Sequence, residues 1–481
     1  MNIKAVLNTL GKLLQVEAGL MLLPLIVALI YREDPIPFLI TIGLLIVIGT
    51  LLTAVLHKGD HLIFEREGFL IVALSWVIMS VFGALPFVIS GAIPSFVDAF
   101  FETVSGFTTT GSTILTDFSV MDSSLLFWRS FTHWIGGMGV LVFIMALLPM
   151  TNSRSVHILK AETTGPTKGG KLVPKMRSTA TILYIIYLAL TVIEVILLLF
   201  GGMTLFEALT YSFATAGTGG YGITAAGVAG FNSPYINIVI SVFMLLFGVN
   251  FNLYYLVLLG NWRSFFKNEE NRWYFAIVGI STLFIAFNIL SLFGNFAESL
   301  MHAFFQVSSI ITTTGFATAD FALWPTASQF LLVLLMLIGA SAGSTGGAIK
   351  VSRIIILLKS IRRSIHKMIR PNQVEVVRLN GSPLDEETVS TTHTFFSLYM
   401  LILFGSGLLV CLDGFDFTTS FTATVACLCN VGPGLGLVGP MGSFAIFSAP
   451  VKLLLSLLML LGRLELFSIV MLFFPEAWRR R

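Results

Sequence analysis

Four glycine-containing loops carry the residues best suited to chemistry in this chain of 481 residues. Each loop ends a segment that runs from a polar residue to a glycine, and the four segments align without a gap. They are Ser95–Gly111, Thr204–Gly220, Ser299–Gly315 and Asp416–Gly432. Because glycine adopts backbone conformations that other residues resist, each loop can turn carbonyl oxygens toward a common centre. Carbonyl oxygens placed in this way replace the hydration shell of a dehydrated cation.

We therefore expect an ion filter built from four similar parts. The alternative interpretation is a repeat whose glycines serve only close helix packing. The candidate filter residues are Thr109, Thr110, Gly111, Ser112, Thr218, Gly219, Gly220, Tyr221, Thr313, Thr314, Gly315, Phe316, Asn430, Val431, Gly432 and Pro433.

Short helices must position these loops. Each segment begins with a good N-cap, namely Ser95, Thr204, Ser299 or Asp416. The acidic residue three positions later predicts a reciprocal capping box in the first two segments. A helix of about 11–12 residues reaches roughly 17 Å, about half the hydrocarbon thickness of a bilayer. We expect four such helices to point their partially negative C-terminal ends at the centre, where they favour a cation.

The composition predicts an all-α integral membrane protein. The chain is 56% apolar and only 11% charged, against roughly 25% charged residues in a soluble domain. Apolar runs of this length satisfy their backbone in lipid as helices. The first run is followed at once by another, which excludes a cleavable signal peptide. Ten runs approach or exceed the roughly 20 residues that span a bilayer: 13–31, 37–56, 69–91, 124–149, 178–201, 234–260, 273–294, 327–358, 393–413 and 449–475.

The order of runs and loops predicts four parallel units around a pseudo-fourfold axis, preceded by two additional transmembrane helices. Each unit consists of a span, a half-length pore helix, a filter loop and a second span. The expected boundaries are 1–66 for the two N-terminal helices, then 67–160, 161–268, 269–375 and 376–481 for the four units.

Charge placement predicts the orientation. The four repeat-bearing segments, 92–124, 202–232, 295–326 and 414–448, contain acids but no lysine or arginine. The segments 151–178 and 359–378 and the C-terminal Arg479, Arg480 and Arg481 are basic. The positive-inside rule places these basic segments and both termini in the cytoplasm, so that the loops open to the outside. An acidic outer surface would attract cations, although the absence of bases also has a topogenic explanation.

A break in the run 327–358 predicts a gate. Four glycines and three hydroxyl residues lie between Gly339 and Gly347 and do not sustain a stable helix. We expect this loop to block the pore when closed, with a plain helix kink as the alternative. Arg463 in the last span is expected to face the pore and touch the loop, with snorkelling to the cytoplasmic interface as its alternative. The candidate gate residues are Gly339, Gly343, Gly346, Gly347, Lys350 and Arg463.

These features resemble the membrane subunits of the bacterial Trk-type potassium uptake transporters, the TrkH/TrkG family, with Ktr and HKT relatives. The resemblance rests on the four units, on Thr-Thr-Thr-Gly-Ser-Thr in the first loop and on Asn-Val-Gly-Pro-Gly in the fourth, and it covers essentially the whole chain. It implies a potassium filter, an intramembrane loop beneath it, a homodimer in the inner membrane, and a cytoplasmic TrkA-like subunit that binds nucleotides.

Only the second loop keeps Gly-Tyr-Gly, at Gly220 to Gly222. The differences among the loops predict transport of potassium and rubidium with less complete rejection of sodium. A potassium transporter coupled to protons or sodium is the alternative; a single clearly broken span and parallel repeats favour a gated pore.

The remaining polar residues predict no enzyme, no covalently bound cofactor and no nucleic-acid partner. We interpret Arg129 and Lys452 as packing or snorkelling charges, and His133 as part of an interfacial aromatic group. His57 and His61 have a spacing that suits a metal but lie in a solvated turn. Cys411, Cys427 and Cys429 are expected to pack as small apolar residues.

Overall fold

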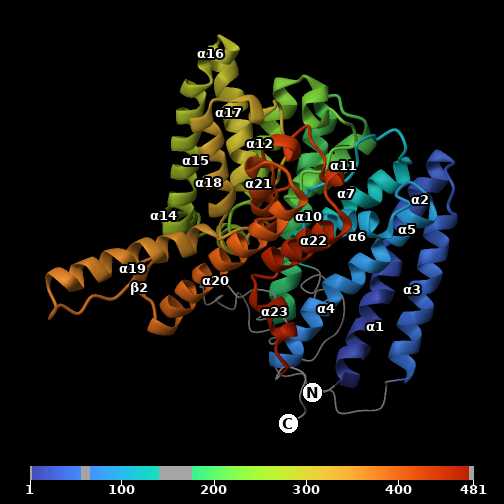
Figure 1. The fold of residues 1–481 in the computed structure, drawn as a ribbon, viewed down its shortest axis with the longest axis horizontal. Coiled ribbons are helices and arrows are strands. Elements are labelled where there is room, and N and C mark those ends of the chain that lie inside the picture. Colours follow the sequence, from blue (N-terminus) through green and yellow to red (C-terminus); the bar gives the residue numbers. More distant parts are fainter. Residues whose placement is uncertain (1–2, 56–64, 140–175, 476–481) are drawn as a thin grey trace.

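A computed structural model describes residues 3–55, 65–139 and 176–475, which are mostly helical (Figure 1). In this part of the chain the strands are a two-residue pair, β1 (Arg378–Leu379) and β2 (Ser382–Pro383). The predictions for His57, His61, the C-terminal arginines and nearly all of the basic segment 151–178 lie outside the described residues.

The N-terminal helices form one side of the molecule. The helix α1 (Ile3–Leu20) packs along α3 (Ile36–Val55) and α4 (Glu65–Gly83), and α2 (Leu22–Tyr31) continues α1 after one turn residue. The short α5 (Leu85–Ile89) leads from α4 into the first repeat segment. In Figure 1, α1 begins and α23 (Phe467–Val470) ends at the same end of the molecule, as expected if both termini lie on one side of a membrane.

The rest of the fold surrounds four short helices, α6 (Phe96–Phe107), α11 (Leu205–Ala216), α17 (Phe296–Ile311) and α21 (Phe417–Leu428). The helices around them are α7 (Ser123–Gly137), α10 (Met176–Phe200), α12 (Pro234–Phe247), α13 (Phe251–Leu258), α15 (Glu269–Asn288), α18 (Thr326–Ile338), α19 (Val351–Ile369), α20 (Glu386–Val410) and α22 (Ala449–Arg463). The connections include α14 (Arg263–Lys267) and α16 (Leu290–Phe293).

Three of the four predicted N-caps are confirmed. The side chains of Ser95, Thr204 and Asp416 each accept a hydrogen bond from the backbone three residues on. Thr204 and Glu207 form the predicted capping box. In the first segment only half of that box forms, because the Asp98 carboxylate accepts a hydrogen bond from Lys452 Nζ at 2.6 Å instead.

The predicted cap of the third helix is wrong. The helix α17 begins one turn earlier, and its N-cap is Asn295, whose side chain accepts from the backbone of Ala297. Ser299 lies buried within the first turns and donates its hydroxyl hydrogen to the carbonyl oxygen of Asn295. Two good caps four residues apart compete here, and the outer one starts the helix because its choice adds a turn of backbone hydrogen bonds.

The number of unbroken spans is smaller than the ten apolar runs suggest. Five helices of the described chain are long and apolar enough to cross a bilayer: Ile3–Tyr31, Ile36–Ala54, Glu67–Ile89, Ala180–Phe200 and Glu386–Asp413. The helices α12 and α13 pass that test only as a pair, bent by 91° at Gly248–Asn250. The expectation of a single broken span is therefore wrong.

Four helices follow the candidate filter loops, and the described structure shows where each of them ends. The helices α7, α12, α18 and α22 end at Gly137, Phe247, Ile338 and Arg463. Glycines beside three of these ends pack against the C-terminal ends of the short helices: Gly136 and Gly462 contact the carbonyls of Phe107 and Leu428, and Gly248 contacts Thr312. These close approaches require glycine, because a β-carbon on Gly136 would lie 1.8 Å from the Phe107 oxygen.

Asp416→Ala is expected to lower the unfolding temperature of the purified protein in detergent, since losing a helix N-cap costs about 0.5–2 kcal/mol. Thr419 donates to the Asp416 carboxylate through its hydroxyl at 2.6 Å and its backbone N–H at 3.0 Å. These bonds lower the pKa of Asp416.

The stabilisation should therefore be complete above the ordinary carboxyl pKa and be lost as the pH falls through the lower folded-state pKa. Asp416→Asn retains an acceptor and serves as the control, with most of the stability kept at neutral pH. Equal unfolding temperatures for the Ala variant and the parent protein at pH 7 would contradict this role.

Candidate ion filter and gating loop

The four short helices end in the same backbone motif. Each has a left-handed residue just after its C-cap: Thr109, Thr218, Thr313 and Asn430, with φ of 55°, 56°, 60° and 54°. The next residue donates its N–H to the carbonyl oxygen five residues back in each copy, as Thr110 does to Ser105 at 2.9 Å. This is the Schellman arrangement, which turns the chain away from the helix axis and satisfies its last carbonyls.

Threonine is an unusual residue at this position. Glycine, or sometimes asparagine, normally takes the left-handed place in such a motif. For other residues the conformation costs roughly 1–2 kcal/mol, and a β-branched residue there is a conformational outlier. Three of the four loops carry a threonine, so the same strain is kept at Thr109, Thr218 and Thr313. Strain of this kind gathers at functional sites, where surrounding structure holds the chain in place.

The predicted filter glycines meet around one centre. A β-carbon on Gly111 would lie 1.9 Å from the carbonyl oxygen of Gly219, and one on Gly220 would lie 1.9 Å from that of Thr314. A β-carbon on Gly315 would lie 2.1 Å from the carbonyl oxygen of Val431.

The fourth contact completes the ring. A β-carbon on Gly432 would lie 2.7 Å from the carbonyl oxygen of Thr110. The four carbonyls come from equivalent positions, each just before a filter glycine. Each glycine therefore leaves room for a carbonyl of the neighbouring loop, and all four have positive φ.

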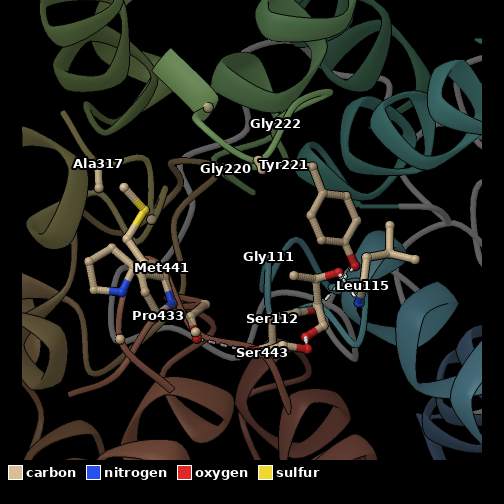
Figure 2. A pocket seen from close by; sticks show the side chains of 18 of the residues that line it. Gly111, Ser112, Leu115, Gly220, Tyr221, Gly222, Ala317, Pro433, Met441 and Ser443 are labelled. Atoms are coloured by element: carbon tan, nitrogen blue, oxygen red, sulfur yellow. Dashed lines mark hydrogen bonds between the residues drawn. The ribbon is translucent and has the colours of Figure 1, made fainter. Parts of the chain in front are cut away.

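The outer side of this ring opens into a cavity of about 390 Å³. Figure 2 shows Gly111, Gly220, Ala317 and Pro433 around its open centre, on loops from four separate parts of the chain. Carbonyl oxygens and the C-terminal ends of helices are partially negative. The site is therefore suited to a cation that has lost part of its water.

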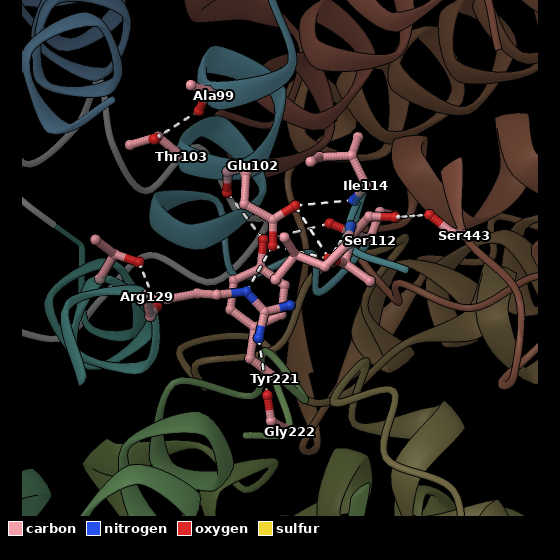
Figure 3. Close-up of polar contacts among 12 residues, drawn as sticks. Ala99, Glu102, Thr103, Ser112, Ile114, Arg129, Tyr221, Gly222 and Ser443 are labelled. Carbon is pink, nitrogen blue, oxygen red and sulfur yellow. Dashed lines mark hydrogen bonds and ion pairs between the residues drawn. The ribbon is translucent and has the colours of Figure 1, made fainter. Parts of the chain in front are cut away.

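An ion pair buried behind the first two loops corrects the interpretation of Arg129. Its Nε lies 2.5 Å from Glu102 Oε1, and the two side chains are 2% and 0% exposed. Arg129 also donates to the carbonyl oxygen of Gly222 at 2.8 Å. Glu102 accepts from the backbone of Ile114 at 2.9 Å and from Thr113 Oγ1 (Figure 3). Arg129 therefore connects the first and second loops from a buried position. These four bonds offset the cost of burying its charge.

His133 is also deeper than expected. Its ring is fully buried and stacks on Tyr221, with ring centroids 4.1 Å apart, so the interfacial placement is wrong. The Tyr221 hydroxyl donates to the Glu102 carbonyl oxygen at 2.9 Å, and the guanidinium carbon of Arg129 lies 3.4 Å from the ring centroid. The second loop is thus held from behind by side chains of α6 and α7.

These ion pairs change the prediction of an acidic outer surface. Two acids of the predicted surface form ion pairs: Glu102 pairs with Arg129 and Asp98 pairs with Lys452. Both basic residues come from helices that lie next to the segments without lysine or arginine. Lys452 is therefore a partner of a pore-helix acid, and its interpretation as a snorkelling charge is wrong. Acids of the repeat segments that remain exposed are Asp117, Asp122, Glu298 and Asp416.

The predicted break between α18 and α19 runs from Gly339 to Lys350. This gating loop is held by the other broken helix pair. Ser341 and Thr345 donate their N–H groups to the carbonyl oxygens of Gly248 and Phe247, and Phe251 donates to Gly343. The two breaks thus satisfy each other's backbone groups, as irregular backbone inside a membrane must be satisfied.

The gating loop contacts the inner side of the ring. Gly347 donates its N–H to Thr313 Oγ1 at 2.7 Å. A β-carbon on Gly347 would lie 2.6 Å from the Cys429 carbonyl oxygen. Lys350 donates to the carbonyl oxygen of Gly346 within the loop. The loop therefore lies against the ends of α17 and α21, and the strained Thr313 presents its hydroxyl to it.

Arg463 makes the expected contact with this loop. Its guanidinium donates to the carbonyl oxygen of Thr345 at 2.6 Å and to those of Gly136 and Gly137 at 2.5 and 2.6 Å. It thus joins the loop to the end of α7 across the inner side of the ring. Glu465, two residues further on, pairs with Arg353.

The sequence analysis missed Arg129, Glu102, His133 and Asn250 as supports of the site. The signal was present for two of them, since Arg129 and His133 lie one helical turn apart inside an apolar run. Asn250 caps α13 and lies beside the gating loop, where it would be 3.0 Å from a β-carbon on Gly343.

Comparisons with known proteins agree with this geometry. Residues 37–479 match the TrkH family model, described as a cation transport protein. The Trk system potassium uptake proteins TrkH and TrkG of Escherichia coli (strain K12) are 37% and 33% identical to the chain, over 100% and 99% of both sequences. The crystal structure of the potassium transporter TrkH from Vibrio parahaemolyticus matches with a TM-score of 0.90 and 33% identity over 100% of both chains. The chain is therefore a multi-pass membrane protein that belongs to the TrkH family of cation transport proteins.

Proposed function

We propose that this protein takes up potassium across the bacterial inner membrane through a gated, channel-like filter. The observation that carries the proposal is the closed ring in which each of four glycines makes room for a carbonyl oxygen of the next loop. Such a ring surrounds an ion from all sides, and its oxygens replace water around a dehydrated cation. Rubidium should pass by the same route, and sodium less well.

The relatives support potassium as the ion. The similar proteins of Escherichia coli are named potassium uptake proteins, and the Vibrio parahaemolyticus structure is that of a potassium transporter. The backbone repeats at Gly111, Gly220, Gly315 and Gly432 support four units, each formed by a span, a pore helix and a second span. By the same resemblance we propose a homodimer with cytoplasmic termini, controlled by a TrkA-like nucleotide-binding subunit.

The gating loop, Gly339 to Lys350, is the proposed gate. It lies against two of the four helix ends, and Arg463 and Thr313 hold it there through hydrogen bonds. Opening requires the loop to leave this place, which breaks those bonds and the ones to Phe247 and Gly248. A partner that binds outside the membrane could shift this balance only through different contacts with the two states.

A transporter coupled to protons or sodium remains the second candidate, and the break between α12 and α13 is the observation that favours it. Two discontinuous helices are typical of alternating-access transporters. Within the described residues, however, helix breaks follow three of the helices around the ring, at the ends of α12, α18 and α22. This arrangement suits a pore with one movable segment better than two inverted halves.

Uptake of rubidium-86 into liposomes that contain the purified chain distinguishes the two candidates. For a pore we expect uptake that follows the electrical gradient, is competed by potassium better than by sodium, and needs no pH or sodium gradient. Uptake that requires a proton or sodium gradient would contradict the pore and establish a coupled transporter. The absence of any potassium preference would contradict the proposed filter.

Gly220→Ala should abolish potassium uptake in this assay. Gly220 has φ of 72°, and an added methyl group would lie 1.9 Å from the Thr314 carbonyl oxygen, inside the ring. Gly91→Ala is the matched control, because Gly91 has φ of 77° but no atom within 4 Å of an added β-carbon. Both variants carry the same kind of backbone penalty, so equal uptake by the two proteins would argue against the ring as the ion path.

Arg463→Ala should raise rubidium uptake by the chain alone, because it removes the three hydrogen bonds that hold the gating loop to α7. Arg463→Lys should give an intermediate rate, since a lysine presents a point charge and not a planar fork. Loss of the exposed charge in Arg263→Ala is the control. An unchanged uptake rate in Arg463→Ala, with normal protein yield, would contradict the proposal that Arg463 holds the gating loop in place.

A further inference from the structure

The second filter loop has glycines at two positions where the first and third loops have threonines. A side chain from a neighbouring helix fills the space that these threonines would occupy. In the first loop, Thr108 and Thr110 share a hydrogen bond between hydroxyl oxygens at 2.8 Å. In the third loop, Thr312 and Thr314 share one at 2.7 Å. Each pair consists of the helix C-cap and the residue that presents a carbonyl to the ring, so it braces the filter from behind.

The corresponding residues of the second loop are Gly217 and Gly219, and His133 fills both places. A β-carbon on Gly219 would lie 2.2 Å from His133 Nδ1 and 2.4 Å from Cε1 and Cγ of the ring. A β-carbon on Gly217 would lie 2.2 Å from the His133 carbonyl oxygen. The imidazole thus stands where the side chain of a threonine would be.

The fourth loop has side chains at both of these positions. There Cys429 and Val431 hold the equivalent positions, both fully buried, and Cys429 Sγ lies 3.0 Å from the hydroxyl of Tyr399. Three loops therefore carry their own braces. The second loop is braced by the imidazole of His133, which belongs to α7, the helix that follows the first loop.

The equivalent of His133 near the fourth loop is an ordinary apolar residue. Gly136 and Gly462 occupy equivalent positions in the first and fourth units. Each lies against the carbonyl of the last residue of the short helix in the same unit. Three residues before Gly462 stands Met459, which is fully buried. The imidazole of His133 therefore stands beside the loop that has two glycines, whereas the equivalent place on α22 holds Met459.

We propose that His133 is a positioning residue that determines ion specificity by bracing Gly219 of the second filter loop. The inference rests on the proposed function, because it concerns the width of the proposed potassium filter. Among the described residues neither ring nitrogen of His133 has a hydrogen-bond partner. The ring thus acts through its shape and its stacking on Tyr221, which holds the loop on the outer side of Gly219.

The physical reason is the small difference between the ions. A carbonyl cage discriminates between potassium and sodium only while its oxygens resist moving toward the smaller ion or away from the axis. With the ring removed, the space behind Gly219 becomes a cavity next to a residue that has no side chain to fill it. The Gly219 carbonyl, which also packs on Gly111, can then shift. One of the four carbonyl oxygens around the ion is then no longer held in position.

A double-mutant cycle tests this inference in the liposome assay, with sodium and potassium as competitors of rubidium-86. His133→Ala should lower the preference for potassium over sodium severalfold while retaining uptake. Gly219→Thr alone should lose uptake, because its side chain would overlap the imidazole. The double variant should regain both uptake and preference, since the new threonine fills the vacated space as Thr110 and Thr314 do in their loops.

Ser130→Ala is the matched control, one helical turn away on α7 and buried like His133. It should leave the ion preference unchanged. If His133→Ala fails to fold, a better yield and higher uptake of the double variant than of Gly219→Thr still supports the inference. Unchanged preference in His133→Ala, or no rescue in the double variant, would overturn it. A wild-type protein without potassium preference would instead overturn the proposed function.

Discussion

The structure depends on the meeting of four like helix ends. The C-terminal ends of α6, α11, α17 and α21 converge, and each carries a partial negative charge of about half an electron. In a medium of low dielectric these ends repel one another unless a cation lies between them. The ring of carbonyls at the four glycines is the place where such an ion fits. The strained threonines, the breaks in the surrounding helices, and Arg129 and Arg463 all serve to hold this arrangement.

The four filter loops have the same backbone conformation, but different side chains hold each of them in place. The first loop is tied to a buried glutamate and arginine, and the second leans on an imidazole and a tyrosine. The third loop shares a hydrogen bond with the gating loop, while Asn430 of the fourth donates to Thr110 Oγ1 and to the Met459 carbonyl oxygen. The filter is therefore fourfold in its carbonyls and asymmetric in everything behind them. Within the described residues, the hydroxyl oxygen of the third loop accepts the hydrogen bond from the gating loop, and Gly347 of the gating loop also packs on Cys429 and Asn430 of the fourth.

Local patterns in the sequence were enough to predict four short helices, three of their N-caps, the four glycines with positive φ that meet at the ring, and the break at Gly339. Each depends on spacing or on a residue's own conformational preference. Ser299 was misplaced because Asn295 offers an equally good cap one turn earlier. The bend at Gly248 was missed because its glycine lies in an otherwise apolar run. Arg129, His133 and Lys452 were read as peripheral because a linear sequence does not tell how deeply a side chain lies once other helices surround it.

Closure of the ring also has a consequence for biosynthesis. Thr110 of the first loop meets Asn430 of the last loop across 320 residues of chain. At a synthesis rate of about 5–20 residues per second, the first loop waits roughly 16–64 s for its partner. Throughout that time a left-handed threonine and the buried Glu102 carboxylate have only part of their final surroundings. The first half of the nascent protein must therefore reside in the membrane as an incomplete intermediate, and a ribosome that stalls before the last quarter leaves a chain whose filter cannot close.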